Sequence, residues 1–324
     1  MTSSHPSRTL PRLLAASGLL TALTLTGCSS TGSGADGDGR EPEAGDAPRI
    51  LNSAELTLPL DAYILRGERV TLLTRAQNTL VEQCMKRYGF RYTGQGGDRV
   101  LNDRARLYGV SDAEQAARYG YSNPDLASGG GERPAPAAQL GPNESLFLHG
   151  EKEVDPSKPV PMSQEEAEQT GQGAITVDGQ KVPAGGCRRE SYLKLYAPTK
   201  DAVDIMLPQN MATDSYLRAG EDSRVRKVTA EWSACMAEKG YKSDDPVSPQ
   251  EDLGFQSAPG SPQAIAAAQQ DVACKERTNL VGVWHTVQTA YQKRVIEKNA
   301  ETLDLAKKQM EDRLRLAAQL TGNG

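Results

Sequence analysis

CMKRYGF, residues 84–90, recurs later in the chain as CMAEKGY, residues 235–241. Both stretches follow the pattern C-M-x-x-x-G-aromatic. Upstream, Asp61-x-Tyr63 and Asp214-x-Tyr216 precede the two cysteines by 23 and 21 residues. The period is far longer than that of solenoid repeats, so the sequence predicts a twofold internal duplication rather than an array.

Each copy predicts the end of an amphipathic helix. Over residues 66–88 apolar side chains recur every three or four positions, and Gly89 can take the left-handed conformation that ends a helix. The same pattern predicts a helix over residues 215–239, closed by Gly240. In both, the cysteine lies in the last turn and the aromatic residue after glycine folds back over the helix end. A short helix over residues 111–119, with its first serine as N-cap, lies between them.

The cysteines predict two disulfides. Four of the five lie after the N-terminal segment: Cys84, Cys187, Cys235 and Cys274. An even number fits an oxidising compartment, and three connectivities are open in principle. The repeat favours Cys84–Cys187 and Cys235–Cys274, since each repeat cysteine is followed by a later cysteine that has a basic neighbour. Each disulfide is expected to contribute about 2–4 kcal/mol.

Metal binding is the competing interpretation of these cysteines. No two of the four are close in sequence, and beyond the N-terminal segment only His149 and His285 could add nitrogen ligands. We therefore expect neither a metal site nor another cofactor.

The remaining patterns complete a mainly helical fold. Residues 124–161 are rich in glycine and proline and predict long surface loops. Residues 175–182 predict a two-stranded hairpin around Asp178-Gly179, which suits a type I′ turn. A helical pattern over residues 261–320 is either bent at Gly282 or projects with an apolar face that needs a partner. We expect a mainly α, disulfide-braced domain with an internal duplication, a small β-hairpin and a long C-terminal amphipathic helix.

The first 28 residues have the layout of an export signal. Two arginines and no acid precede an apolar run over residues 13–25. This run is too short to cross a bilayer core, which needs about 20 residues. The end of this segment, LTGC at residues 25–28, resembles a bacterial lipobox. The resemblance implies cleavage before Cys28 and a diacylglyceryl group on its thiol. An ordinary signal peptide with an incidental cysteine, or an uncleaved anchor, is the alternative.

Cleavage would leave a mature chain with 35 basic and 42 acidic residues and a formal charge of −7. An acidic chain without a long basic stripe is a poor candidate for nucleic-acid binding. The predicted organisation has four parts: a lipoprotein signal peptide (1–27), a flexible Ser/Gly/Asp/Pro-rich tether (28–52), a first helix-cysteine unit (53–200), and a second unit with the long helix (201–324).

Several of these stretches also carry a family resemblance. They are the lipobox, VEQCMKRYGF (81–90), YGVSDAEQAARYGY (108–121), VPAGGC (182–187) and ACKERTNLVGVWHTVQ (273–288). Together they resemble secreted lipoproteins of actinobacteria, over most of residues 51–305. The resemblance implies an extracytoplasmic location and the cysteine framework, and it implies no catalytic residue.

The sequence offers few candidates for chemistry. It has no G-x-S-x-G elbow, P-loop or H-E-x-x-H motif. The carboxylate pair Glu165-Glu166 is typical of a helix start, and Asp244-Asp245 is typical of a solvated turn. A hydrolase that uses carboxylates alone is the alternative interpretation. Arg188-Arg189 could grip an anionic wall polymer, and a solvated basic turn is the simpler interpretation. Tyrosines such as Tyr108 and Tyr121 could line a groove or fill the core.

These observations predict a membrane-anchored lipoprotein on the extracytoplasmic face of the cell membrane. We expect a non-enzymatic binding or interaction module, with the last helix as a partner surface. Its expected partners are the membrane, through the lipid on Cys28, and an envelope protein or cell-wall polymer. The alternative is a cell-wall-active hydrolase with paired carboxylates. A substrate-binding protein of a transporter would need alternating strands and helices, a pattern that this chain lacks.

Overall fold

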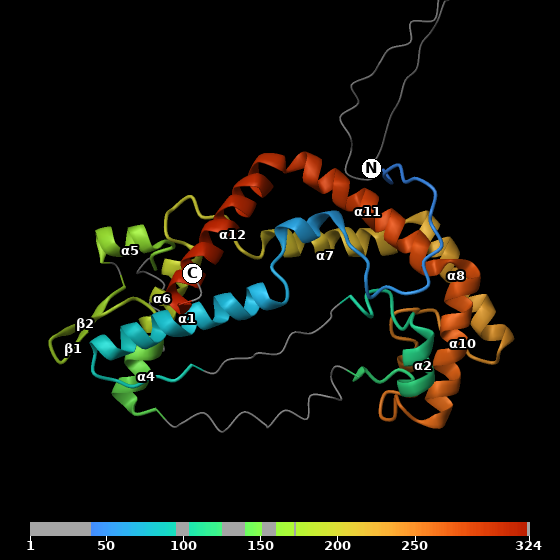
Figure 1. The fold of residues 1–324 in the computed structure, drawn as a ribbon, viewed down its shortest axis with the longest axis horizontal. Helices are drawn as coiled ribbons and strands as arrows, with labels where there is room; N and C mark the ends of the chain where they lie inside the picture. Colours follow the sequence, from blue (N-terminus) through green and yellow to red (C-terminus); the bar gives the residue numbers. More distant parts are fainter. Residues whose placement is uncertain (1–39, 95–103, 125–139, 151–159, 172, 323–324) are drawn as a thin grey trace, which may run out of the picture. The chain divides into compact units, whose positions relative to one another are not determined.

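The computed structural model describes residues 40–94, 104–124, 140–150, 160–171 and 173–322. The fold is mainly helical with one two-stranded hairpin, as predicted (Figure 1). Its elements are η1 (Pro59–Tyr63), α1 (Glu68–Arg87), α2 (Ala113–Tyr119), α4 (Pro142–His149), α5 (Gln164–Thr170), β1 (Ile175–Val177), β2 (Gln180–Val182), α6 (Gly186–Tyr196), α7 (Leu207–Gly220), α8 (Ser223–Glu238), α9 (Pro249–Asp252), α10 (Pro262–Thr278), α11 (Leu280–Lys298) and α12 (Ala300–Thr321). The predicted signal peptide and Cys28 lie outside the described residues.

Helix α1 ends as the repeat predicts. Gly89 has φ 81°, the left-handed region that favours glycine. The N–H of Phe90 donates to the carbonyl of Met85 at 3.1 Å, and the N–H of Gly89 donates to Lys86 at 3.0 Å. These two hydrogen bonds form a Schellman motif, which satisfies carbonyls that the helix end would leave without partners.

Helix α8 ends with the same hydrogen bonds. Gly240 has φ 86°, Tyr241 donates to Met236 at 3.0 Å, and Gly240 donates to Ala237 at 3.0 Å. The repeated sequence therefore encodes a repeated helix end, with a cysteine one position before the methionine that accepts the Schellman hydrogen bond.

The two disulfides join the pairs that the repeat favours. Cys84 of α1 is bonded to Cys187 of α6, with a Cα–Cα distance of 5.6 Å. Cys235 of α8 is bonded to Cys274 of α10, with a Cα–Cα distance of 5.7 Å. All four cysteines are buried. Each disulfide thus fastens a Schellman helix end to a later helix.

The predicted hairpin is also present. Strands β1 and β2 pair antiparallel, with Val177 opposite Gln180. Asp178 and Gly179 have φ 49° and 79°, as a type I′ turn requires. The chain then enters α6 through Gly186, where a Cβ would lie 2.7 Å from the Leu148 carbonyl. The glycine before Cys187 therefore allows α6 to approach α4.

The predicted C-terminal helical run is divided into α10, α11 and α12 (orange to red in Figure 1), and the expected bend at Gly282 is wrong. The first break is at Asn279, which has φ 55° and ends α10. Its side chain accepts the N–H of Ile50 at 3.2 Å and donates to the Pro48 carbonyl at 3.1 Å. Gly282 instead leaves room for that carbonyl, which a Cβ would strike.

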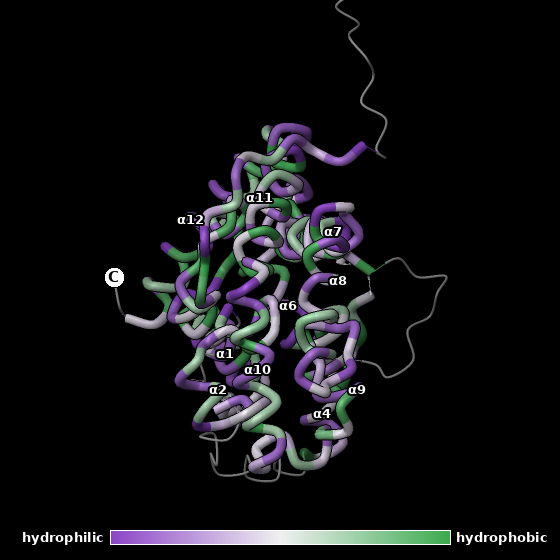
Figure 2. Tube along the Cα trace, turned by 90° about the vertical axis from the view of Figure 1, so that its right-hand side faces the viewer, coloured by the Kyte–Doolittle hydropathy of each residue, from purple (hydrophilic) through white to green (hydrophobic). Residues whose placement is uncertain are grey.

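The face of α12 that carries Leu303, Met310 and Ala317 is buried against the chain itself, whereas Leu305 and Leu316 of the same helix are exposed. Leu303 is fully buried with Leu60 of η1. Ala317 is fully buried in a cluster with Leu73 of α1 and Leu195 of α6. The alternation of hydrophilic and hydrophobic residues along α12 is visible in Figure 2.

The core around the second disulfide contains aromatic residues and one buried ion pair. Tyr108 and Trp232 have no exposed surface, and Tyr121 is 5% exposed, so the first unit's tyrosines help to fill the core as expected. Inside it, Asp271 and Lys275 of α10 form an ion pair. The pattern of the sequence did not predict this pair, because both residues stand in a helix among other charged residues.

The later part of the predicted tether contacts the folded chain. The carboxylate of Glu41 accepts hydrogen bonds from the backbone and hydroxyl of Ser223, at 2.6 and 2.7 Å. Arg224 donates to the carbonyl of Pro42 at 2.9 Å. These contacts seat residues 41–42 at the N-terminal end of α8. In the described part of the chain, no helix combines the length and apolar character that crossing a membrane would require.

Candidate functional site

The predicted site residues are four cysteines that form disulfides and one cysteine that the structure does not describe. Cys84, Cys187, Cys235 and Cys274 are consumed in disulfides. Cys28, the predicted lipidation site, lies outside the described residues. Within the described ranges, no three His, Cys, Asp or Glu side chains are grouped so that they could hold a metal ion.

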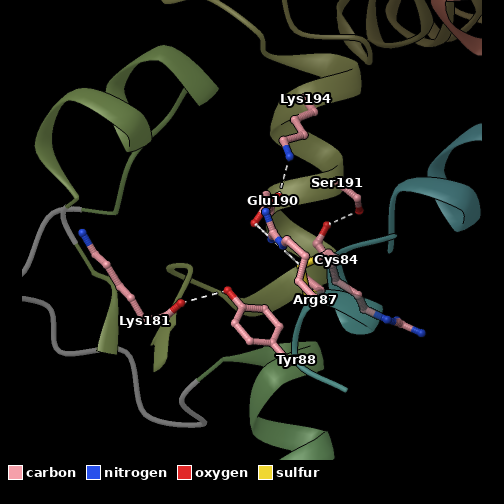
Figure 3. Close-up of a disulfide and its surroundings, with 9 residues drawn as sticks. Cys84, Arg87, Tyr88, Lys181, Glu190, Ser191 and Lys194 are labelled. Atoms are coloured by element: carbon pink, nitrogen blue, oxygen red, sulfur yellow. Dashed lines mark hydrogen bonds and ion pairs between the residues drawn. A yellow bond between two sulfur atoms is a disulfide. The ribbon is translucent and has the colours of Figure 1, made fainter. Parts of the chain in front are cut away.

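Charged side chains of α1 and α6 surround the first disulfide. Arg87 and Lys194 both point towards Glu190 (Figure 3), at 2.6 and 2.5 Å. Burial alone would raise the pKa of Glu190, but the hydrogen bonds and charges of the two cations outweigh burial and hold that pKa below its usual value. Glu190 therefore links both helices as an ionised carboxylate.

The hairpin joins this cluster through Tyr88. The hydroxyl of Tyr88 donates to the carbonyl of Lys181 at 2.8 Å (Figure 3), and Arg87 lies 5.5 Å from the centre of the Tyr88 ring. A hollow of about 290 Å³ adjoins these residues. Because both cations are already paired with Glu190, the cluster is best explained as a brace that supplements the disulfide.

Arg188-Arg189, for which a solvated basic turn is the simpler interpretation, has one exposed and one bonded side chain. Arg189 donates to the carbonyl of Pro161 at 2.7 Å and so holds the segment before α5. Arg188 is exposed. Burial and, as a smaller cause, the charge of Arg188 lower the pKa of His149. Among the described residues, Arg188 and Arg189 therefore have different neighbours.

A larger hollow of about 650 Å³ lies between α7, α8, α11 and residues 244–247. Two aromatic rings line it, Tyr216 of α7 and Trp284 of α11. Their centres are 5.5 Å apart and their planes differ by 12°. Tyr108 packs behind them, 5.4 Å from Trp284. The rings form an apolar wall that rests on the core.

Three carboxylates line the same hollow: Glu221, Asp244 and Asp245. All three residues are exposed. Asp244 lies 2.9 Å from the hydroxyl of Ser233, and the carboxylate of Asp245 accepts the N–H of Val247 at 2.8 Å. These contacts hold the two aspartates at the edge of the hollow and leave acceptor sites open to a ligand.

The polar groups of the two rings have different settings. Burial and the charge of Asp245 raise the pKa of Tyr216 to about 12, so its hydroxyl keeps its proton at neutral pH. Trp284 is 7% exposed, and its buried Nε1 has no acceptor among the described residues. Buried polar groups are usually paired, so an unpaired indole N–H beside a hollow is a feature to explain.

Sequence reasoning found only part of this hollow. It singled out Asp244-Asp245 and interpreted them as a solvated turn, which agrees with their exposure. It treated Tyr216 as part of the repeat and Trp284 as part of an apolar helix face. The sequence indicated the importance of Tyr216 only through its place in the repeated motif. It could not show that Tyr216 contacts Trp284, because that contact depends on how α7 packs against α11.

The hollow combines flat apolar rings with three carboxylate acceptors, and among the described residues its lining includes one cation, Arg226. Such a surface suits a neutral ligand that has apolar faces and several hydroxyl groups, because O–H···O⁻ hydrogen bonds are strong and aromatic rings cover apolar faces. The resemblance to actinobacterial lipoproteins rests on the sequence patterns alone. No family model, no curated protein and no solved structure matches this chain.

Proposed function

We propose that this chain is an extracytoplasmic lipoprotein, anchored by a lipid on Cys28, that binds a neutral saccharide of the cell envelope. The anchor is supported by the basic start, the short apolar run and the lipobox-like exit at residues 25–28. Two disulfides support it further, because disulfides persist outside the reducing cytoplasm.

The observation that carries the binding proposal is the hollow beside Tyr216 and Trp284. Its aromatic wall offers a surface for the apolar face of a sugar ring, and Asp244 and Asp245 offer acceptors for hydroxyl groups. Arg226 is the only cation that lines it in the described residues, against three carboxylates. The charge balance therefore disfavours an anionic polymer at this position.

Binding is tested with the mature protein and a tetramer of β-1,4-linked N-acetylglucosamine. The chain has two tryptophans, and Trp232 is fully buried with its Nε1 bonded to Asp271 at 2.9 Å. A ligand in the hollow should therefore change mainly the fluorescence of Trp284. A titration gives the dissociation constant.

A pair of variants locates the site. Asp244→Asn removes one acceptor charge, and the loss of a charged hydrogen bond, about 1.5–3 kcal/mol, should weaken binding roughly tenfold or more. Asp304→Asn removes an exposed carboxylate from α12, a helix that contributes no residue to the described lining of the hollow, and should leave binding unchanged. Equal affinity of both variants, or no binding of the tetramer, would refute the proposed site.

A wall-active hydrolase is the second candidate, favoured by the three carboxylates in one hollow. Carboxylate-based glycoside hydrolysis needs an acid and a second carboxylate on opposite sides of the bond. Incubation with the tetramer and detection of new reducing ends tests it. Turnover that Asp244→Asn or Asp245→Asn abolishes would replace the binding proposal, and intact tetramer after long incubation would exclude the reaction on this substrate.

A further inference from the structure

A second cavity of about 230 Å³ lies apart from the proposed saccharide site, between α1, α12, η1 and residues 203–209. Its wall is mainly aliphatic: Ile64, Leu65, Val70, Leu73, Met206 and Met310. Val70 and Met206 are 46% and 50% exposed, so the cavity is open to solvent between them.

A buried cation lines this apolar cavity. Arg313 of α12 is 7% exposed. Its Nε donates to the carbonyl of Leu195 at 3.0 Å, and its Nη2 donates to the carbonyl of Tyr196 at 3.2 Å. The Tyr196 ring lies 5.2 Å from the guanidinium carbon. These contacts cap the end of α6 and fix the position of the charge.

Arg313 has no carboxylate partner among the described residues. Asp204 also lines the cavity, but Asp204 is exposed, and its carboxylate accepts the N–H of Met206 at 2.9 Å. The second terminal nitrogen of Arg313, Nη1, forms no hydrogen bond within the described ranges. Burial lowers the pKa of Arg313, and only the nearby Tyr196 and Tyr192 oppose that effect. An unpaired buried charge is costly.

We infer that this cavity binds a small aliphatic carboxylate, whose carboxylate pairs with Arg313 and whose hydrocarbon body fills the apolar space. A guanidinium is the side chain best suited to a planar carboxylate. The volume lies between the ~150 Å³ cavity that holds benzene and the ~300 Å³ lower limit of drug-sized sites, which suits a body of roughly six to ten carbon atoms.

Isothermal titration of the mature protein with octanoate tests this inference, and octanamide is the matched uncharged ligand. We expect octanoate to bind at least tenfold more tightly than octanamide, a ratio that corresponds to about 1.4 kcal/mol. Equal affinity of acid and amide would overturn the inference. The acyl groups predicted on Cys28 carry no free carboxylate and would behave as the amide does.

A third ligand distinguishes an aliphatic acid from the C-terminus of a peptide, because both present a carboxylate. N-acetyl-leucine presents its carboxylate as the C-terminus of a peptide does, on a short branched side chain. Weaker binding of N-acetyl-leucine than of octanoate supports the aliphatic assignment. Tighter binding of N-acetyl-leucine would overturn that assignment in favour of a peptide end.

Variants at Arg313 and Val70 provide the structural control. Arg313→Gln should abolish the preference for octanoate over octanamide, but it also removes the contacts with α6 and can disturb folding. Val70→Asp leaves Arg313 in place and adds a negative charge at the cavity mouth, so it should weaken octanoate binding tenfold or more. Val70→Asn has the same shape without charge and should weaken it far less. Equal octanoate binding by these two Val70 variants would overturn the inference.

Discussion

Lys275 lies 3.1 Å from Asp271 in the interior of the molecule, one turn along the same helix, and the two residues are 2% and 0% exposed. Lys275 also donates to the carbonyl of Val110 at 2.8 Å, and Asp271 accepts the indole N–H of Trp232 at 2.9 Å. The pair therefore connects α10 to α8 and to the segment before α2, beside the second disulfide.

Replacement of one partner should destabilise the protein strongly. Asp271→Asn leaves the Lys275 ammonium buried without a counter-charge, and such a loss typically costs about 3–5 kcal/mol. Urea unfolding at neutral pH measures the change. The double variant Asp271→Leu/Lys275→Met removes both charges and should be less destabilised than Asp271→Asn alone. A double variant that is as unstable as the single variant would contradict this explanation.

The ends of α1 and α8 and both disulfide pairs follow from short-range patterns. The single helix predicted over residues 215–239 is wrong: its first part belongs to α7, which ends at Gly220, and α8 begins at Ser223 after the N-cap Asp222. The last turn of α1 and its glycine are set by neighbouring residues, so the repeat predicts them. The short helix predicted over residues 111–119 begins slightly later, because Asp112 is the N-cap of α2 and accepts the N–H of Gln115 at 2.8 Å. Ser111 contacts the Ser53 hydroxyl instead, at 3.0 Å.

The candidate sites were harder to predict because their residues meet only through tertiary packing. Trp284 and Arg313 both stand in helical patterns where an apolar or a solvated face is the ordinary explanation. Their importance depends on distant partners: Trp284 packs on Tyr216, and Arg313 donates to Leu195, more than one hundred residues earlier. The break at Asn279 likewise depends on contacts with the segment around Pro48.

The Glu190 cluster should give the stability of the protein a dependence on acid pH. The pKa of Glu190 is lowered in the folded state, so the unfolded chain takes up the proton more readily. Its contribution is complete above the unfolded pKa of about 4.3 and is lost as the pH falls through the lower folded pKa. Glu190→Gln should therefore lower the melting temperature at pH 7 more than at pH 3.

Glu168 supplies the control for that measurement, because it lines the same hollow but is exposed. Glu168→Gln should change the melting temperature little at either pH. If Glu190→Gln lowers the melting temperature equally at pH 7 and pH 3, its effect is one of packing rather than charge.

The two disulfides should differ in their contribution to stability. Cys84 and Cys187 are 103 residues apart, and Cys235 and Cys274 are 39 residues apart. Chain-entropy estimates give about 5 kcal/mol for the longer loop and about 4 kcal/mol for the shorter one. Cys84→Ala/Cys187→Ala should therefore be less stable in urea than Cys235→Ala/Cys274→Ala. Peptide mapping without reduction checks the pairing, and a Cys84–Cys235 peptide would disprove it.

The lipid anchor is tested at the N-terminus of the protein isolated from a cell that exports it. We expect mass spectrometry to find a peptide that begins at Cys28 and carries acyl groups. Stable anchoring needs two hydrophobic signals, which a diacylglyceryl group supplies. Cys28→Ser should release the protein from the membrane fraction. An unmodified Cys28, or a Cys28→Ser protein that stays in the membrane fraction, would exclude this anchor.

The equivalence of the two repeat units can be tested at their helix ends. Gly89 and Gly240 have positive φ, and at both positions a Cβ would meet nothing within 4 Å. Only the left-handed backbone should therefore oppose a side chain, at a cost of about 1–2 kcal/mol. We expect Gly89→Ala and Gly240→Ala to lower the free energy of unfolding by similar amounts in this range. Gly282→Ala should act differently, because its Cβ would displace the Pro48 carbonyl and the segment that carries it. We expect Gly89→Ala and Gly240→Ala to lose similar amounts of unfolding free energy. Only Gly282→Ala should reduce the protection of residues 41–50 from hydrogen exchange. A large difference between Gly89→Ala and Gly240→Ala would show that the two Schellman ends are not equivalent.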